Sequence, residues 1–326
     1  MDKWVVYILL AVCLSSCGRG NGNKQVGFSN STIADSVPTE AIRLKRQGND
    51  LFNNGDLEDA HKYYIKAIEL APEYDTAFYD LGKVYSRLGD DKRAIENYTK
   101  ALKVNPYYIF AYYNRGNNKA NIGDNNGAIS DYSEAIRLNP LFAEAYFNRG
   151  QVKSVIGNNK GAIVDYTEAI KINPQYASAY YNRGNIKSNI YDNTNAIIDY
   201  KKAIEINPQH TSAYINLGVA QYETKDYEGE IATYRLAIRN CSPDADLYNN
   251  LGRALYDLKR FKEAAEAYGE GIKAFPSDGK LYYGRGLTRN QSGDKNGACE
   301  DWHRSSELGC IQANALLPLC DVINKK

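Results

Sequence analysis

The sequence predicts an all-α protein, an α-solenoid of eight stacked helix-turn-helix repeats that ends in a capping helix. Two spacings support this prediction, because glycine and proline each recur every 34 residues. The glycines are Gly48, Gly82, Gly116, Gly150, Gly184, Gly218, Gly252 and Gly286. The prolines are Pro72, Pro106, Pro140, Pro174 and Pro208, after which Pro243 is displaced by one residue and Pro276 restores the spacing. The eight units are therefore 41–74, 75–108, 109–142, 143–176, 177–210, 211–244, 245–278 and 279–312.

Residues 1–16, ahead of the repeats, are predicted to be a lipoprotein signal peptide. The uncharged segment 4–14 is too short to cross about 30 Å of hydrocarbon as a helix, but it has the length of a secretion-signal core. The segment Leu14-Ser15-Ser16-Cys17 resembles the lipobox of bacterial lipoproteins, which implies that Cys17 becomes the acylated first residue. Ordinary secretory cleavage nearby, or an apolar start without a targeting role, is the alternative.

Residues 17–40 are predicted to be the lipidated Cys17 followed by a flexible tether, because they are rich in Gly, Asn and Ser and show no periodicity. Gly18 follows Cys17, and the absence of Asp at that place resembles outer-membrane sorting. We therefore expect a lipid-anchored protein of the bacterial cell envelope, in the outer membrane, that contacts the membrane through this anchor only.

Each repeat can be understood from residues 109–142, with positions numbered from 1 to 34 within the unit. Gly116 lies on a first helix, and Asp124 follows a glycine turn and is placed to cap a second helix. Ala128 and Tyr132 belong to the apolar stripe of that second helix, which ends before Pro140. Glycine at position 8 and alanine at position 20 lack bulk, so the two helices can approach closely. One hairpin cannot bury its own apolar face, and stacked neighbours complete the core.

These units resemble tetratricopeptide repeats, which are stacked helix-turn-helix pairs. Three departures stand out: tyrosine replaces the family's usual tryptophan at position 4 in six repeats, Glu230 replaces the small residue of position 20, and Gly271 replaces an alanine. We therefore expect the junction of the sixth and seventh repeats to be irregular or locally mobile. The eighth repeat lacks the proline and runs into 313–326, which is predicted to be a capping helix (residues 313–324) and tail.

Four repeats share a pattern of charge. The third, fourth, fifth and eighth repeats alone combine arginine at position 7, a cation at position 11 and aspartate at position 23. Folding the hairpin brings positions 7 and 23 opposite each other, so we expect four structural ion pairs with the second cation nearby. The alternative is a cationic ladder for an anionic ligand. The expected pairs are Arg115 with Asp131, Arg149 with Asp165, Arg183 with Asp199, and Arg285 with Asp301.

Composition excludes several classes of function. A net charge of +1, from 40 Lys and Arg against 39 Asp and Glu, gives no electrostatic reason to expect a nucleic-acid partner. The three histidines fall in three different repeats, and no phosphate-binding loop or metalloprotease motif is present. We therefore expect no catalytic residues, no cofactor and no metal, and a protein that is not an enzyme.

Four cysteines remain after Cys13 and Cys17 are assigned to the signal and the anchor. Cys299 and Cys320 flank the turn at Cys310 almost symmetrically, so antiparallel helices would bring them together as a disulfide. Two alternatives stay open. One is a zinc site formed by Cys299, His303, Cys310 and Cys320, although that spacing is unlike common zinc motifs, and the other is small buried thiols.

The resemblance implies that first helices line a groove through positions 2, 5, 9, 12 and 13. Position 5 holds Lys45, Tyr79, Tyr113, Phe147, Tyr181, Ile215, Asn249 and Tyr283, and position 9 holds Asn49, Lys83, Asn117, Gln151, Asn185, Val219, Arg253 and Leu287. An aromatic row beside an amide row suits an extended peptide. The alternative is packing between neighbouring helices. The candidate binding residues are Tyr79, Lys83, Tyr113, Asn117, Phe147, Gln151, Tyr181 and Asn185.

The same resemblance allows the family's carboxylate clamp to be checked. Lys45 and Asn49 match its first two positions, but Asp80, Phe110 and Asn114 replace the other three, so we reject chaperone C-termini as partners. We expect a membrane-tethered, non-enzymatic scaffold that binds a protein or peptide in its groove. A carbohydrate-binding lipoprotein and a structural assembly subunit are the alternatives, and the oligomeric state stays open.

Overall fold

The computed structural model describes residues 37–323, so the signal peptide, Cys17 and most of the tether lie outside the described residues. Within that range the regular elements are all helices, and the predicted all-α solenoid is confirmed. The helices are α1 (Thr39–Asn53), α2 (Leu57–Leu70), α3 (Asp75–Arg87), α4 (Asp91–Val104), α5 (Ile109–Asn121), α6 (Asn125–Leu138), α7 (Ala143–Val155), α8 (Asn159–Ile172), α9 (Ala177–Asn189), α10 (Asn193–Ile206), α11 (Thr211–Glu223), α12 (Tyr227–Asn240), α13 (Ala245–Asp257), α14 (Phe261–Ala274), α15 (Gly279–Gln291), α16 (Lys295–Glu307), α17 (Ile311–Asn314) and α18 (Leu317–Ile323).

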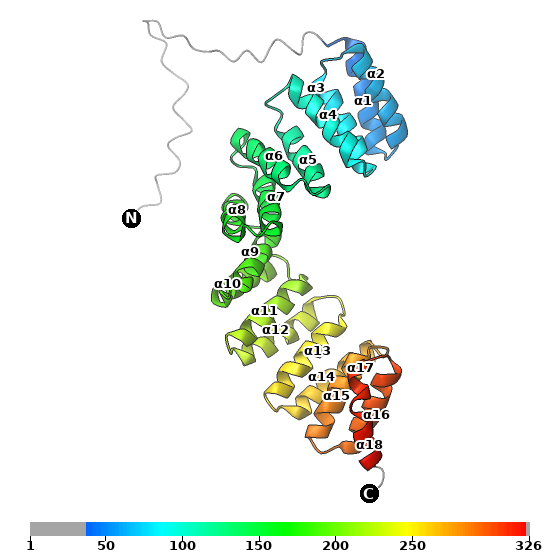
Figure 1. Ribbon diagram of the computed structural model, residues 1–326, viewed down its shortest axis with the longest axis vertical. Helices are drawn as coiled ribbons and strands as arrows, with labels where there is room; N and C mark the ends of the chain where they lie inside the picture. Colours follow the sequence, from blue (N-terminus) through cyan, green and yellow to red (C-terminus); the bar gives the residue numbers. More distant parts are fainter. Residues whose placement is uncertain (1–36, 324–326) are drawn as a thin grey trace, which may run out of the picture.

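The helices form consecutive hairpins that follow one another along the long axis of the molecule (Figure 1). The α1–α2 hairpin lies at one end, and the α15–α16 hairpin with α17 and α18 lies at the other. Each helix packs against its hairpin partner and against the next hairpin, so the core is a continuous line of small clusters.

A glycine–tyrosine contact closes each hairpin from the first repeat to the seventh. A Cβ added at Gly116 would lie 2.9 Å from Tyr132 Cε1, and the corresponding distance from Gly48 to Tyr64 Cε1 would be 2.7 Å. Both rings are almost fully buried. Glycine at position 8 is therefore required by the ring at position 24, and in the eighth repeat Trp302 occupies the place of that tyrosine against Gly286.

The turn inside each hairpin needs a left-handed residue. Gly123 has φ of +81°, and Asp124 then caps α6 by accepting a hydrogen bond from the Gly127 amide at 3.0 Å. In the fifth, sixth and seventh repeats the left-handed position is occupied by Tyr191, Lys225 and Lys259, at φ of 60–63°. These three turns carry backbone strain that glycine would relieve.

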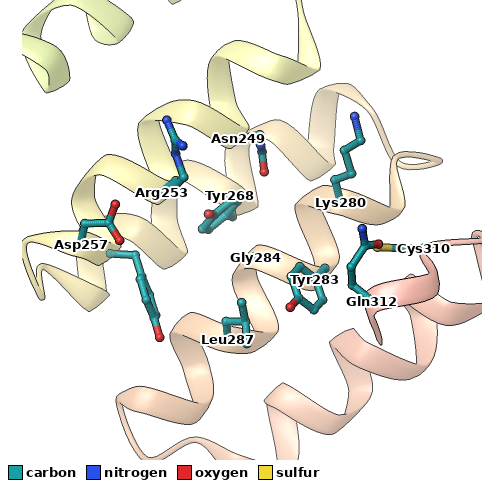
Figure 2. A pocket seen from close by; sticks show the side chains of 11 residues that line it. Asn249, Arg253, Asp257, Tyr268, Lys280, Tyr283, Gly284, Leu287, Cys310 and Gln312 are labelled. Carbon is teal, nitrogen blue, oxygen red and sulfur yellow. The ribbon is translucent and has the colours of Figure 1, made fainter. Parts of the chain in front are cut away.

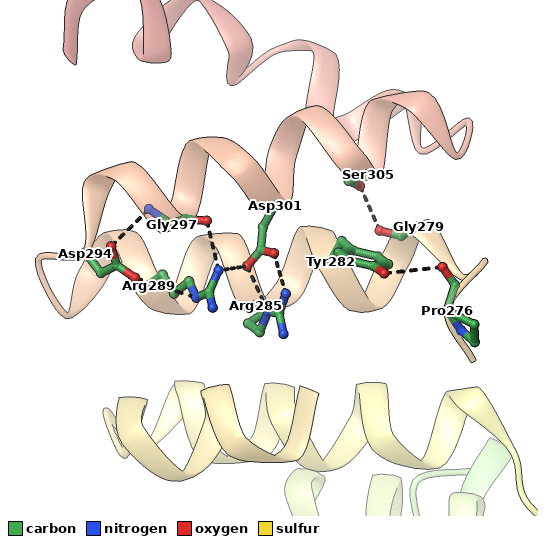
Figure 3. Close-up of polar contacts among 9 residues, drawn as sticks. All are labelled: Pro276, Gly279, Tyr282, Arg285, Arg289, Asp294, Gly297, Asp301 and Ser305. Carbon is green, nitrogen blue, oxygen red and sulfur yellow. Dashed lines mark hydrogen bonds and ion pairs between the residues drawn. The ribbon is translucent and has the colours of Figure 1, made fainter. Parts of the chain in front are cut away.

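The four predicted ion-pair positions lie together in the structure. Each arginine binds its aspartate through two hydrogen bonds of 2.6–3.0 Å, and the position-11 cation lies 2.8–3.0 Å from the same carboxylate. Figure 3 shows the last of these clusters, with Asp301 between Arg285 and Arg289. The four carboxylates are nearly fully buried, so both of their oxygens need these donors.

Three of these arginines also reach the preceding repeat. Arg149 Nη1 donates to the Ser133 hydroxyl at 2.9 Å, and the third and fifth repeats make the same contact to Thr99 and Thr167. Position 7 thus links successive hairpins as well as the two helices of one hairpin. Sequence analysis did not foresee this second role.

The two regions expected to depart from the repeat do so in different ways. The sixth-to-seventh junction continues the stack, but its connection 241–244 is irregular, and the Asp244 side chain there caps α13. The single capping helix predicted over 313–324 is instead two short helices, α17 and α18. The break precedes Pro318, which has no amide hydrogen and is tolerated only in the first turn of α18.

The end of the solenoid is closed by a disulfide. Cys299 of α16 is bonded to Cys320 of α18, with their Cα atoms 5.5 Å apart, whereas Cys241 and Cys310 are free thiols. The bond excludes the zinc alternative for these two residues. It holds α18 against a cluster that contains Trp302, Tyr283 and Leu287.

Candidate binding surface

The first helices of neighbouring hairpins contact one another directly, as α5, α7 and α9 do in turn. We call the surface formed by α1, α3, α5, α7, α9, α11, α13 and α15 the first-helix face. All the groove residues proposed from the sequence lie on these helices. The structure therefore gathers them on one surface, and their contacts show which of them have groups left for a ligand.

The position-5 aromatics pack against other rings of their own repeat. The centroid of each ring lies 4.6–4.8 Å from that of the ring at position 34, and it lies 5.6–6.1 Å from the core tyrosine at position 24. The four position-34 partners are Tyr108 for Tyr79, Phe142 for Tyr113, Tyr176 for Phe147, and His210 for Tyr181. All four aromatics are at least half-buried, which favours the packing alternative for much of their surface.

The amides at position 9 are also engaged within the chain. Asn117 Oδ1 accepts hydrogen bonds from the Tyr132 hydroxyl at 2.8 Å and from Asn148 Nδ2 at 2.9 Å. Asn185 Oδ1 accepts from Tyr200 at 2.9 Å and from Asn216 Nδ2 at 2.9 Å. These amides orient the buried tyrosine hydroxyls, and the carbonyl oxygen of each already has two donors.

A residue that sequence analysis overlooked completes this network. Asparagine at position 6 donates across to the preceding repeat, from Asn114 to the Tyr79 hydroxyl at 2.9 Å and from Asn148 to the Tyr113 hydroxyl at 3.0 Å. Asparagine recurs there at residues 114, 148, 182, 216 and 250, and this 34-residue spacing was the available signal. We call the bonds among positions 5, 6, 9 and 24 the amide ladder.

Lys83 is bound as well, whereas Gln151 is not. Asp80, which is 5% exposed, accepts from Lys83 Nζ at 3.1 Å and lies 2.8 Å from Lys45 Nζ. Lys45, the first residue of the clamp-like pattern, is therefore already paired with a carboxylate of the chain itself. This pairing agrees with the rejection of chaperone C-termini as partners. Gln151 is exposed and makes no side-chain hydrogen bond to the residues that the structure describes.

Two hollows open on the first-helix face. The first, of about 460 Å³, lies between α5 and α7 and is lined mainly by amides, including Asn121, Asn125 and Gln151, with Val155 at its edge. The second, of about 390 Å³, lies between α13 and α15, and we call it the C-terminal hollow (Figure 2). Its lining is Asn249, Arg253, Tyr256, Asp257, Tyr268, Lys280, Tyr283, Gly284, Leu287, Cys310 and Gln312.

The C-terminal hollow uses positions 2, 5, 9, 12 and 13, which are the groove positions that the resemblance implies. Its lining includes Gly284 at position 6, where the third to seventh repeats have an asparagine. A Cβ at Gly284 would lie 2.4 Å from the ring of Tyr268, so this tyrosine forms part of the floor. Cys310 and Gln312, just beyond α16, provide a wall that no ordinary repeat supplies.

A buried acid lies behind this hollow. Glu230 of α12 is 1% exposed, and neither of its carboxyl oxygens has a hydrogen-bond partner among the described residues. Burial raises the pKa of Glu230 to about 7, while the nearby Arg253 opposes the rise and Asp257 adds to it. Burial also raises the pKa of Tyr234, one turn along α12, to about 12.

Seven segments of the chain match family models of known repeats. Family models described as TPR repeat match residues 48–89, 119–153, 156–189 and 192–225, and models described as Tetratricopeptide repeat match 76–108, 211–242 and 245–278. The chain belongs to the tetratricopeptide repeat family. The matches end at residue 278, so the family models do not cover the eighth repeat. That repeat is identified from the structure, as the hairpin α15–α16. No curated protein sequence matches the chain.

Several solved structures share the fold. A tetratricopeptide repeat protein from Parabacteroides merdae ATCC 43184 is 18% identical, with a TM-score of 0.53 over 86% of this chain and 99% of that one. MamA from residue 41 onward, from Desulfovibrio magneticus RS-1, is 19% identical, with a TM-score of 0.51 over 54% of this chain and 99% of that one. YrrB, named as a TPR protein with an unusual peptide-binding site, is 23% identical, with a TM-score of 0.50 over 60% and 97%. At these identities the likeness concerns the fold.

Residues 37–323 contain no group of three or more His, Cys, Asp and Glu side chains placed to hold a metal ion. None of the helices in this range combines the length and the apolar character that a membrane crossing requires.

Proposed function

We propose that this tetratricopeptide repeat scaffold binds a protein or peptide partner on its first-helix face and that a lipid on Cys17 tethers it to the bacterial cell envelope. The observation that carries the binding proposal is the C-terminal hollow, where exposed charged and amide groups surround aromatic and aliphatic side chains. Such a mixture of apolar contact area and hydrogen-bonding groups suits a peptide segment.

The hollow between α5 and α7 supports the same proposal. Asn125 and Gln151 both line this hollow and make no side-chain hydrogen bonds to the described residues. Free amides can pair with the backbone of an extended segment. A partner that spans several repeats would thus find amides in the middle of the solenoid and aromatic groups near its end.

The carbohydrate alternative depended on exposed tyrosine faces beside amides. In the middle repeats those rings lie against other rings, and two of the position-9 amides are bound to buried hydroxyls. These rings are partly buried against one another, and the hollow there is lined mainly by amides, which favours a peptide over a sugar.

Site-specific photo-crosslinking tests the binding proposal. A photoreactive residue at Gln151 or Gln312, both exposed on the proposed surface, should give an adduct with the same partner protein in cells. Val164, which is 59% exposed on the second helix α8, is the matched control and should give none. Equal adducts from all three sites would contradict binding on the first-helix face and would favour the structural-subunit alternative.

The tether is tested separately. Cells fed a labelled fatty acid should incorporate it into the wild-type chain, and Cys17→Ser should abolish both incorporation and sedimentation with the outer membrane. Cys13→Ser is the matched control, because the proposed signal peptide is removed with it. Incorporation into the Cys17→Ser chain would contradict the lipidation proposal.

A further inference from the structure

Exposed apolar side chains gather around the start of α5 and the connection from α6 to α7, outside both hollows. Tyr107 is 66% exposed, Phe110 is 56% exposed and Leu141 is 75% exposed. Tyr107 lies just before α5, and the ring of Phe110 contacts the ring of Phe142, next to Leu141, with centroids 5.8 Å apart. We call Tyr107, Phe110 and Leu141 the loop patch.

The connections between hairpins do not require apolar residues at these places. In four successive connections an asparagine side chain accepts a hydrogen bond from the backbone amide of position 33, at 3.0–3.1 Å. Position 33 is Tyr107 and Leu141 in the first two connections, but the exposed Gln175 and Gln209 in the next two. Because the same turn forms with either kind of residue, the two apolar side chains are free to contact another body, as exposed apolar clusters commonly do.

The charge around the loop patch is nearly balanced. Residues 104–114 include no charged side chain, and Lys103, just before them, is exposed and makes no ion pair with any described residue. Two acids lie nearby: Asp75, which accepts from Asn105 Nδ2 at 2.8 Å, and the exposed Glu144. Burial of apolar and aromatic surface, and not attraction of charge, would therefore drive any contact made by the patch.

The loop patch lies on the edge of the solenoid where the predicted tether enters. Because each hairpin is antiparallel, all first helices run in one direction, so the starts of α1, α5 and α7 share this edge. Neighbouring first helices are about 10 Å apart, which places the patch about 20–30 Å along the stack from α1. Residues 17–40 would have an end-to-end distance of about 25 Å as a flexible coil. A lipid on Cys17 would thus keep this edge close to the bilayer and raise the local concentration of lipid at the patch.

The opposite edge also carries exposed apolar side chains. Position 14, at the turn inside each hairpin, holds Leu88, Ile122, Ile156 and Ile190, which are 46–58% exposed. These side chains are aliphatic, whereas tyrosine is a residue favoured at the boundary of membrane and water. The length of a first helix, about 20 Å, separates them from the edge where the tether enters. An anchored chain therefore presents the loop patch to the membrane and position 14 away from it.

We propose that the loop patch rests on the lipid bilayer, with Tyr107, Phe110 and Leu141 inserted at the boundary of headgroups and acyl chains. The evidence is the exposed apolar cluster, its place on the edge where the tether enters, and the fact that the turn does not require it. The inference rests on the proposed lipid tether. It adds a second, non-covalent contact to the contact through the anchor alone that the sequence predicts, and it fixes which edge of the solenoid faces the membrane.

Tryptophan fluorescence of the full lipidated chain in phosphatidylcholine vesicles tests the inference. Tyr107→Trp places the probe in the patch, and Leu88→Trp, at a residue that is 58% exposed on the opposite edge, is the matched control. The wild-type chain gives the background of Trp4 and Trp302. In vesicles whose acyl chains are brominated near the headgroup, the Tyr107→Trp emission should fall by about half, because an inserted ring lies within about 10 Å of the bromine atoms. The Leu88→Trp emission should be unchanged.

Adding Phe110→Ser and Leu141→Ser to Tyr107→Trp should abolish the quenching, while the chain still floats with the vesicles through Cys17. All of these side chains are exposed, so the melting temperature should change little. Equal quenching at both edges, or no quenching at Tyr107→Trp in a chain that floats, would overturn the inference and leave the tether proposal standing. A chain that neither floats nor incorporates labelled fatty acid would contradict the tether, and the inference would fall with it.

Discussion

Glu230 occupies a position where the other repeats have alanine, and replacing it by glutamine tests the electrostatics of the sixth repeat. The carboxyl group is 1% exposed and lacks a hydrogen-bond partner among the described residues. Removing its charge should relieve a desolvation cost that Arg253 only partly offsets. Glutamine keeps the shape of the side chain, so the effect of the charge is isolated.

The magnitude follows from the pKa of Glu230, which rises from 4.5 to about 7 in the folded chain. Between these values the unfolded chain has lost the proton while the folded chain still holds it. Folding is therefore most stabilised below pH 4.5, and that stability is lost as the pH rises toward 7. At 1.36 kcal/mol per pH unit, the loss from this one group is about 3 kcal/mol. Glu230→Gln should avoid it.

Urea unfolding of the wild-type and Glu230→Gln chains at pH 4.5 and pH 8 measures the difference. Because long repeat arrays do not always unfold in one step, hydrogen exchange of the α12 amides should accompany it. The free energy of unfolding of the variant should equal that of the wild type at pH 4.5 and should be about 3 kcal/mol higher at pH 8. Glu223→Gln, at an exposed position of α11, is the control and should change neither value. Parallel pH dependence in wild type and Glu230→Gln would refute the reasoning.

Three further predictions concern other parts of the solenoid. Asp165→Ala leaves Arg149 without its buried partner and should lower the free energy of unfolding in urea by about 3 kcal/mol. Adding Arg149→Leu should recover most of that loss. Equal or reversed losses in the single and double variants would contradict the pairing. Reducing the Cys299–Cys320 disulfide, whose sequence separation is 21 residues, should lower the free energy of unfolding by about 3 kcal/mol. Dithiothreitol should therefore lower the melting temperature of the wild-type chain, but not that of the variant with alanine at both positions. Tyr191→Gly should stabilise the chain by about 1 kcal/mol in urea, because Tyr191 is 89% exposed at φ of +62°; a loss of stability would show that the ring makes a contact worth more than the strain.

The repeat itself could be predicted because its determinants recur within one unit. Gly116 and Tyr132 lie in the same hairpin, and so do Arg115 and Asp131, so a 34-residue alignment places each pair correctly. The left-handed turn and its aspartate cap are local for the same reason. The structure brings all of these residues together as the sequence indicates.

The surface could be predicted only in part, because its contacts join different repeats. Asn148 bonds to Asn117, 31 residues earlier, and to Tyr113, 35 residues earlier. Neither separation equals the period, since both depend on how one hairpin is rotated against the next. A sequence pattern identifies which positions face the groove, but it does not show which of their polar groups are already paired.

The two ends of the amide ladder show what the pattern controls. In the middle repeats an aromatic ring at position 5 and an asparagine at position 6 of the next repeat satisfy each other's hydrogen bonds. In the last two repeats Asn249 replaces the ring and Gly284 replaces the asparagine, and the ring of Tyr268 occupies the space beside Gly284. A hollow nevertheless lies between α5 and α7, where the ladder is intact. The ladder therefore decides which side chains line a hollow, amides in the middle of the solenoid and tyrosines near its end, and does not decide whether a hollow opens.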